Sequence, residues 1–172
     1  MVVNNLIDNP GSAAIHYGLQ LGEWGLHPWV AGQIAIVGNV LNHGPDTRAG
    51  LALFSTNGTP CEIFLVDNLA FDRAGNPVRL TSGAYTSRDS PPTWPPGLQS
   101  IPANKVKEYV LANAGARPWD RDAVDRRSIQ QVSDATGKIP DSEQEAGGYP
   151  NPPQARHEFD ASQWDLSTMT SR

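Results

Sequence analysis

The hydrophobic and polar positions of the first 75 residues repeat in three similar segments. In each segment a valine precedes an asparagine by two residues, two apolar or small residues follow, and a polar residue closes the pattern. The segments are residues 3–9, 37–43 and 66–72, and the shared asparagines are Asn5, Asn39 and Asn68. Their separations of 34 and 29 residues indicate an internal repeat of one structural unit.

The pattern suits a bend between two short strands, with apolar side chains on either side of the bend pointing into a shared core. An asparagine at each bend can donate a hydrogen bond to one neighbour and accept one from the other, so stacked copies form a column of satisfied amides. We therefore predict an all-β solenoid, a partial parallel β-helix with long loops, over residues 1–75. The alternative is an antiparallel sandwich in which the asparagines only mark turns.

The rest of the chain has a different pattern. Residues 76–103 are rich in Pro, Ser, Thr and Gly, and proline disrupts regular sheet pairing, so we predict an extended segment on the solenoid surface, fixed by Trp94. Residues 104–172 are predicted to form two short helices and an irregular tail packed on the solenoid. The tail carries three aromatic residues that we expect to act as anchors: Tyr149, Phe159 and Trp164.

Two amphipathic stretches predict the helices. The first begins with Asn104 as its cap, runs to about Ala112 and stops at Gly115. The second runs from about Asp122 to Ala135, and Gly137 ends it. Both apolar stripes are short, so we expect the helices to dock on the solenoid.

Composition narrows the function classes. With 16 Gly, 15 Pro and 38% hydrophobic residues among 172, the chain suits short strands and turns better than a helical bundle. A net charge of −5 without a Lys/Arg cluster disfavours nucleic acid as a partner. Cys61 is the only cysteine, which excludes an intrachain disulfide and suggests a small buried side chain. We find no membrane-spanning run and no signal peptide at the start of the sequence.

Two stretches near the C-terminus carry a family resemblance. Residues 110–125, with the sequence Val-Leu-Ala-Asn-Ala-Gly-Ala-Arg-Pro-Trp-Asp-Arg-Asp-Ala-Val-Asp, resemble the C-terminal signature of bacterial pectate-lyase-like proteins, and so do residues 136–142 with 147–150. The segments 4–11, 16–18, 37–40 and 44–47 resemble coils of the same family. The resemblance covers nearly the whole chain and implies a right-handed parallel β-helix.

The resemblance also implies a reaction class. Such lyases cleave acidic, polygalacturonate-like polysaccharides by β-elimination, usually with an arginine as the base and with Ca²⁺ on carboxylate oxygens. Neither the catalytic stretch nor the calcium carboxylates of the family are found in this sequence, and Arg117-Pro118 belongs to the C-terminal signature. We therefore expect a C-terminal fragment of a secreted lyase that is inactive by itself, with no calcium site assignable in this chain.

The start of the sequence fits that expectation. A solenoid needs a cap over its open end, and this chain begins directly on a repeat. We expect the missing N-terminal half of the solenoid, or another polypeptide, to cover that end.

Four residues are candidates for carbohydrate binding. His16 and Tyr17 can line a groove on the first coil, although a packing role explains them as well. Trp24, like Trp29, can stack on a sugar ring or simply anchor a loop. Arg48 lies with Asp46 in a Gly-Pro loop, where the simpler interpretation is a turn closed by Asp46 beside a solvated arginine.

Two other functions stay open at this point. One is a complete, non-catalytic β-helix module that binds carbohydrate or acts as a scaffold. The other is a β-helix hydrolase, which requires two carboxylates flanking the glycosidic bond, and no such pair stands out. The acidic pairs Asp67/Asp72 and Glu143/Glu145 do not predict a metal cage.

Overall fold

The computed structural model describes residues 1–149, of which residues 1–139 form one compact unit and residues 140–149 belong to a second. In the second unit, Tyr149 is exposed and its hydroxyl donates a hydrogen bond of 2.9 Å to Glu143. The predicted anchors Phe159 and Trp164 lie outside the described residues.

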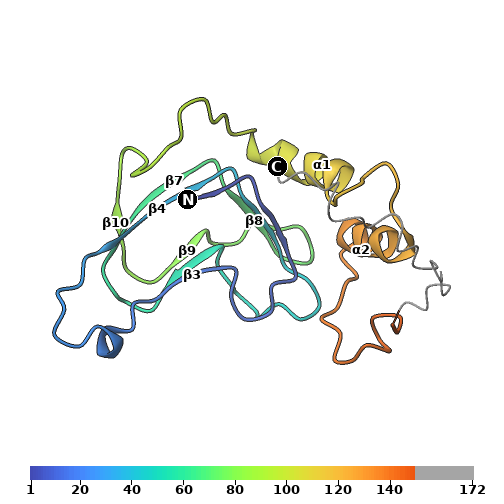
Figure 1. The fold of residues 1–172 in the computed structure, drawn as a ribbon, viewed down its shortest axis with the longest axis horizontal. Coiled ribbons are helices and arrows are strands. Elements are labelled where there is room, and N and C mark those ends of the chain that lie inside the picture. Colours follow the sequence, from blue (N-terminus) through green and yellow to red (C-terminus); the bar gives the residue numbers. More distant parts are fainter. Residues whose placement is uncertain (150–172) are drawn as a thin grey trace, which may run out of the picture. The chain divides into compact units, whose positions relative to one another are not determined.

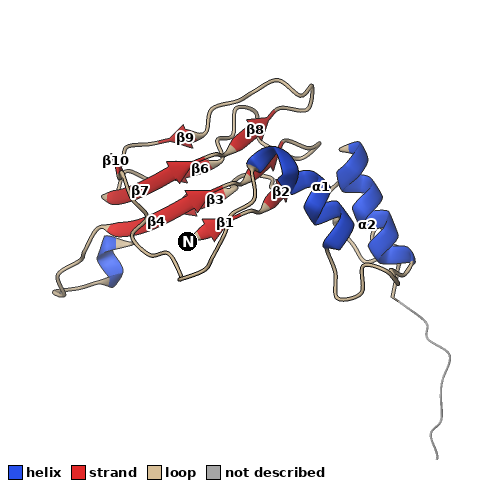
Figure 2. Cartoon of the chain, turned by 90° about the horizontal axis from the view of Figure 1, so that it is seen from above, coloured by secondary structure: helices blue, strands red, loops and turns tan. Residues whose placement is uncertain are grey.

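The first unit consists mainly of short strands in three parallel sheets (Figures 1 and 2). Sheet 1 has the order β1-β4-β7-β10, sheet 2 the order β2-β5-β8 and sheet 3 the order β3-β6-β9. The strands are β1 (Val2–Val3), β2 (Leu6–Asp8), β3 (Ile15–Tyr17), β4 (Gly32–Val37), β5 (Val40–Asn42), β6 (Phe54–Thr56), β7 (Cys61–Val66), β8 (Leu69–Phe71), β9 (Thr81–Ser82) and β10 (Thr86–Ser87). A short 3₁₀ helix, η1 (Leu21–Glu23), follows β3.

Consecutive strands enter different sheets, and every third strand returns to the same sheet. β1, β2 and β3 begin sheets 1, 2 and 3, and the next three strands pair with them in parallel. All pairings between the named strands are parallel. The antiparallel sandwich is therefore wrong, and the topology is compatible with a parallel β-helix.

The predicted asparagine column is present at the bend between sheets 1 and 2. Asn5 Nδ2 donates to Asn39 Oδ1 at 2.9 Å, and Asn39 Nδ2 donates to Asn68 Oδ1 at 3.0 Å. The backbone N–H groups of Asn5 and Asn39 donate to the same two oxygens. Asn39 is fully buried, so this column satisfies polar groups that otherwise destabilise the interior.

The residue before each column asparagine adopts a left-handed backbone conformation. Asn4, Gly38 and Asp67 have φ angles of 53°, 65° and 51°. Asn, Gly and Asp are the residues that tolerate this conformation best. The Asn-Asn, Gly-Asn and Asp-Asn pairs thus supply a two-residue bend in each copy of the repeat.

The inner faces of the three sheets form the main core. Its buried residues are Ile36, Leu41, Leu53, Phe54, Cys61, Ile63 and Ala70. Cys61 is a buried free thiol, as predicted, and burial raises its pKa.

Two helices complete the first unit. Helix α1 (Ala103–Asn113) lies on the outer face of sheet 2, where Ala103 and Val106 pack on Val40 (Figure 1). Helix α2 (Ala123–Asp134) begins at Asp122, which accepts hydrogen bonds from two backbone N–H groups of its first turn. Within residues 1–149, neither helix has the length and apolar surface needed to cross a bilayer.

The helix ends differ from the prediction at two points. Asn104 is inside α1 and does not cap it; Asp67, from the bend of the third repeat, accepts a hydrogen bond of 2.9 Å from Ala103 N. The left-handed residue that ends α2 is Ala135, not Gly137. At the start of α1 a contact from a distant part of the chain replaces the local signal, whereas α2 ends on local bonds from Ala135 N and Thr136 N to Gln131 O.

The Pro-rich stretch also differs in part. Its first residues form β9 and β10, which extend sheets 3 and 1, so the expectation of no sheet pairing is wrong there. After β10 no strand forms before α1. Trp94 is half-buried, donates to Leu98 O, and lines a hollow with Phe64 and Val66 of sheet 1, in agreement with its predicted role.

Candidate functional site

The outer face of sheet 3 presents a row of polar side chains. The register places His16 of β3 beside Ser55 of β6, and Ser55 beside Ser82 of β9. Their neighbours Ile15 and Phe54 belong to the core, so the alternation of a strand turns the polar row outward. His16 is exposed, and its Nδ1 lies 3.0 Å from Ser55 Oγ.

A glycine leaves room for the polar groups at the end of this row. A Cβ atom on Gly18 would lie 2.9 Å from Asn57 Nδ2 and 3.2 Å from His16 Nε2, so a larger residue here would require these side chains to shift. Asn57 is held by Thr59, whose hydroxyl donates to Asn57 Oδ1 at 2.8 Å. We call His16, Ser55, Asn57 and Thr59 the sheet-3 polar cluster.

The loop between β3 and β4 follows this cluster along the chain and carries exposed apolar side chains. Its backbone is attached to the cluster, because Leu19 N donates to Thr59 Oγ1 at 3.1 Å. Trp24 and Trp29 have exposed fractions of 40% and 44%. Indole rings on a loop beside hydroxyl, amide and imidazole groups provide both stacking and hydrogen bonding.

Two arginines lie at the opposite end of sheet 3, in the loops that lead into β6 and β9. Arg48 is exposed, and its backbone N–H donates to Gly11 O in the loop before β3. Arg79 is also exposed, and its Nε donates to Gly50 O at 3.2 Å. This contact brings the loop that carries Arg48 and the loop that carries Arg79 together at one corner of the unit. Guanidinium groups are well suited to carboxylates.

The structure separates the predicted pair His16 and Tyr17. Tyr17 packs against the core, and its hydroxyl accepts a hydrogen bond of 3.1 Å from Gly32 N. A Cβ on Gly32 would lie 2.5 Å from the Tyr17 ring, which shows how closely the ring is packed. Tyr17 thus lies below the face that His16 presents to solvent, and it closes the corner between β3 and β4.

Asp46 links distant segments rather than its own turn. Its carboxylate accepts hydrogen bonds from Asn9 Nδ2 at 2.9 Å and from Ile139 N at 2.8 Å, and these two bonds lower its pKa. Asn9 Nδ2 also donates to Gly137 O. Asp46 therefore holds the end of the unit against the corner between sheets 2 and 3, and the predicted bond to nearby backbone is wrong.

The calcium implied by the family resemblance has no matching donor set in the described residues. Within residues 1–149, no three His, Cys, Asp or Glu side chains converge so that they can hold a metal ion. Asp67 is used in the contact with α1. Asp72 accepts hydrogen bonds from the Asn76 side chain and from the backbone N–H groups of Asn76 and Ala74, and these bonds lower its pKa. These carboxylates do not fit a calcium site, and we assign no metal-dependent step to them.

Sequence reasoning nominated His16, Trp24 and Arg48 as candidates but not Ser55, Asn57 and Arg79, which the structure places in the same region. The repeat alignment places Asn39 against Asn5, 34 residues apart, whereas His16 pairs with Ser55, 39 residues away. The loop before β6 is five residues longer than the loop before β3, so the register of sheet 3 cannot be read from the repeat. The alternation Phe54-Ser55-Thr56 was the one local signal. No protein-family model, no curated protein and no solved structure matches this chain.

Proposed function

We propose that this chain is a unit of a right-handed parallel β-helix that binds an acidic, polygalacturonate-like polysaccharide on the outer face of sheet 3. The observation that carries the proposal is the open row His16–Ser55–Ser82, with exposed tryptophans at one end and two arginines at the other. The larger protein is proposed to be a pectate-lyase-like enzyme, to which this unit contributes substrate binding.

The β-helix interpretation is supported by the topology and by the asparagine column. Parallel strands of one sheet require crossover connections, and here each crossover passes through the two other sheets. Such crossovers are right-handed in nearly all proteins. Identical amides stacked at one bend also fit a coil that repeats itself.

The polysaccharide interpretation is supported by the chemistry of the surface. Sugar hydroxyls need donors and acceptors in a row, and the sheet-3 polar cluster supplies imidazole, hydroxyl and amide groups. An indole ring can stack on the apolar face of a sugar ring, and the exposed side chain of Trp24 is accessible for such a contact. A uronate carboxylate matches the guanidinium groups of Arg48 and Arg79 in charge and shape.

The experiment measures binding of polygalacturonate oligosaccharides to the full chain by isothermal titration calorimetry. We expect Trp24→Ala and the double variant Arg48→Ala/Arg79→Ala each to weaken binding by roughly tenfold, the effect of one lost stacking or charge-assisted contact. The arginine effect is expected to diminish at high salt, whereas the tryptophan effect persists.

Matched controls come from the same chain. Trp119→Ala removes an exposed tryptophan and Arg126→Ala removes an exposed arginine, and both residues lie in the helical region away from sheet 3 (Figure 2). Both controls are expected to bind as the unchanged chain does. Equal losses in the controls, or binding of uncharged xylan as strongly as polygalacturonate, would refute the proposed surface.

A further inference from the structure

The sequence contains a single Asn-Gly pair, Asn57-Gly58, and the structure places it in the exposed turn between β6 and β7. A glycine after an asparagine matters chemically, because a backbone nitrogen with no side chain beside it has free access to the preceding side-chain amide. Every other asparagine is followed by a residue that carries a side chain. Attack of the backbone on a side-chain amide is therefore least hindered at this pair.

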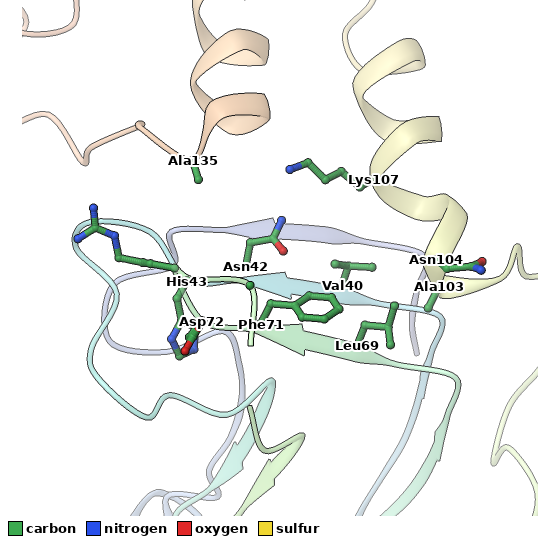
Figure 3. Close-up of a pocket in the computed structure, with 12 residues that line it drawn as sticks. Val40, Asn42, His43, Leu69, Phe71, Asp72, Ala103, Asn104, Lys107 and Ala135 are labelled. Atoms are coloured by element: carbon green, nitrogen blue, oxygen red, sulfur yellow. The ribbon is translucent and has the colours of Figure 1, made fainter. Parts of the chain in front are cut away.

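Asn42 of sheet 2 shows the opposite, protected setting. It lies in β5 beneath the side chain of Lys107 of α1 (Figure 3). The nitrogen that follows it belongs to His43, which is buried, and this nitrogen donates a hydrogen bond of 2.9 Å to Phe71 O. A nitrogen held in this way inside a sheet is not available to react with the amide before it.

The turn at Asn57 folds the side chain over the nitrogen of Gly58. Asn57 Oδ1 accepts hydrogen bonds from Thr59 N at 3.2 Å and from Thr59 Oγ1 at 2.8 Å, so the side chain closes a ring of atoms that includes this nitrogen. The Gly58 N–H donates to Thr56 Oγ1 at 3.3 Å, a longer bond than that of His43. A Cβ atom on Gly58 would meet open space in the described chain, so water reaches the turn.

The two donors on Thr59 also favour the reaction electronically. When a nucleophile attacks the Cγ atom of an amide, negative charge develops on its oxygen. Asn57 Oδ1 is the atom that receives both hydrogen bonds from Thr59. Donors already in place at such an oxygen stabilise the transition state.

We propose that Asn57 is a self-modification site, at which the chain converts its own amide into a carboxylate. The Gly58 nitrogen loses its proton to water and bonds to Asn57 Cγ. The Cγ–Nδ2 bond then breaks, and the nitrogen leaves as ammonia after taking a proton from water. Water opens the resulting cyclic imide at either of its carbonyl carbons, which gives aspartate or isoaspartate. The balance consumes one water molecule, releases one ammonia molecule and transfers no electrons.

The product places a negative charge in the sheet-3 polar cluster. The effect of this charge on binding rests on the proposed function, since it requires that the cluster binds an acidic polysaccharide. A carboxylate at position 57 repels the uronate groups. In the isoaspartate form the longer backbone also displaces Thr59, whose hydroxyl accepts the Leu19 N–H from the tryptophan-bearing loop. Modification thus weakens the binding surface as the protein ages.

The first experiment keeps the full chain for days in mildly alkaline buffer and follows each asparagine by peptide mass spectrometry. Asn57 is expected to gain the mass difference between a hydroxyl and an amino group, in both the aspartate and the isoaspartate form. Asn113 is exposed as well but is followed by Ala114, so it serves as the internal control and is expected to stay unchanged. An intact Asn57, or equal conversion of Asn57 and Asn113, would overturn the proposal.

Two variants test the role of the turn. Thr59→Ser keeps the hydroxyl donor and is expected to convert at an unchanged rate. Thr59→Val removes the donor and is expected to slow the conversion by roughly threefold to tenfold, less than in an enclosed oxyanion hole because water surrounds this turn. Circular dichroism verifies that both variants are folded. An equal or faster rate in Thr59→Val would refute the role of the hydroxyl.

A second pair of variants tests the effect on binding. Asn57→Asp is expected to weaken binding of polygalacturonate oligosaccharides by roughly threefold to tenfold. Asn113→Asp adds the same charge at the end of α1 and is expected to bind as the unchanged chain does. Equal affinities of the two variants would refute the effect on the sheet-3 polar cluster. The mass measurement decides the modification itself, even if the chain binds no polysaccharide.

Discussion

The outer faces of sheets 2 and 3 use one backbone arrangement for opposite purposes. On sheet 2, the row Leu6–Val40–Leu69 is apolar and lies under α1. On sheet 3, the row from His16 to Ser82 is polar, and neither helix of residues 1–149 lies over it (Figure 1). Since both sheets share the same inner core, the outward side chains decide whether a face is covered or open. A polar row in a repeat with a well-packed core is therefore a place to look for binding.

The largest effect is expected from a charge on the covered face. Val106 is fully buried between α1 and sheet 2, so Val106→Asp should destabilise the fold by about 4 kcal/mol or detach the helix. His16→Asp places the same charge on the open face and should change the free energy of unfolding by less than about 0.5 kcal/mol. Urea denaturation of both variants measures the difference, and equal effects would contradict the distinction between the faces.

The next-largest loss of stability is expected from the asparagine column at the bend between sheets 1 and 2. Asn39→Ala deprives the Asn5 backbone N–H and Nδ2 of their shared acceptor and removes one of the two donors to Asn68 Oδ1, at a cost of about 3 kcal/mol. Asn5→Ala removes an exposed member and should cost less than about 1 kcal/mol. Thermal unfolding measures both, and a larger loss for Asn5 would show that burial does not set the strength of the column.

The attachment of α1 to the outer face of sheet 2 depends in part on Asp67. Asp67→Gly keeps the left-handed bend but removes the acceptor for Ala103 N, so α1 should lose about 1 kcal/mol of local stability. Amide hydrogen exchange should become faster in the first turn of α1 and stay unchanged in β6. Unchanged exchange in α1 would mean that the apolar contacts alone hold this helix on sheet 2.

The smallest effect concerns the protonation of Asp8, on the face of sheet 2 that α1 covers, and its influence on stability. Burial raises the pKa of Asp8 above its ordinary value of 3.8, although Lys107 and the Asn42 amide act in the opposite direction. The folded state thus binds a proton more tightly than the unfolded state, and the stability of the unchanged chain falls as pH rises from that ordinary value through the folded-state pKa.

Asp8→Asn lacks this pH dependence. Its stability relative to the unchanged chain should therefore increase from about pH 3 to about pH 7, by a small amount because Asp8 is only partly buried. Urea denaturation across that range measures the trend. An opposite trend would indicate that the attraction of Lys107 exceeds the effect of burial.

The part of the fold that sequence reasoning could predict is the part fixed by local chemistry. The three asparagines were found because each bend needs the same two-residue turn, and the burial of Cys61 followed from its apolar stretch. The predicted bounds of helix α2 were nearly correct because its cap, Asp122, is local in the sequence. These features require no knowledge of what lies across the sheet.

The parts that failed depend on distant contacts. The cap of α1 comes from Asp67, 36 residues earlier, and no pattern near Asn104 indicates it. Asp46 bonds to Ile139, 93 residues away. On sheet 3, unequal loops shift the register, so Ser55 could not be assigned to the row of His16 before the strands were paired.

The asparagine column has a direction, because Asn5 donates toward Asn39 and Asn39 donates toward Asn68. Each rung therefore presents an amide donor to the following rung and an amide oxygen to the preceding one, so rungs can be added only in a single orientation. Residues 32–60 span one such rung, since Gly32 pairs with Cys61 at the same place in the next. A tandem duplication of that stretch would preserve every amide contact, which gives the molecule a simple route to grow longer by copying a segment of its own gene.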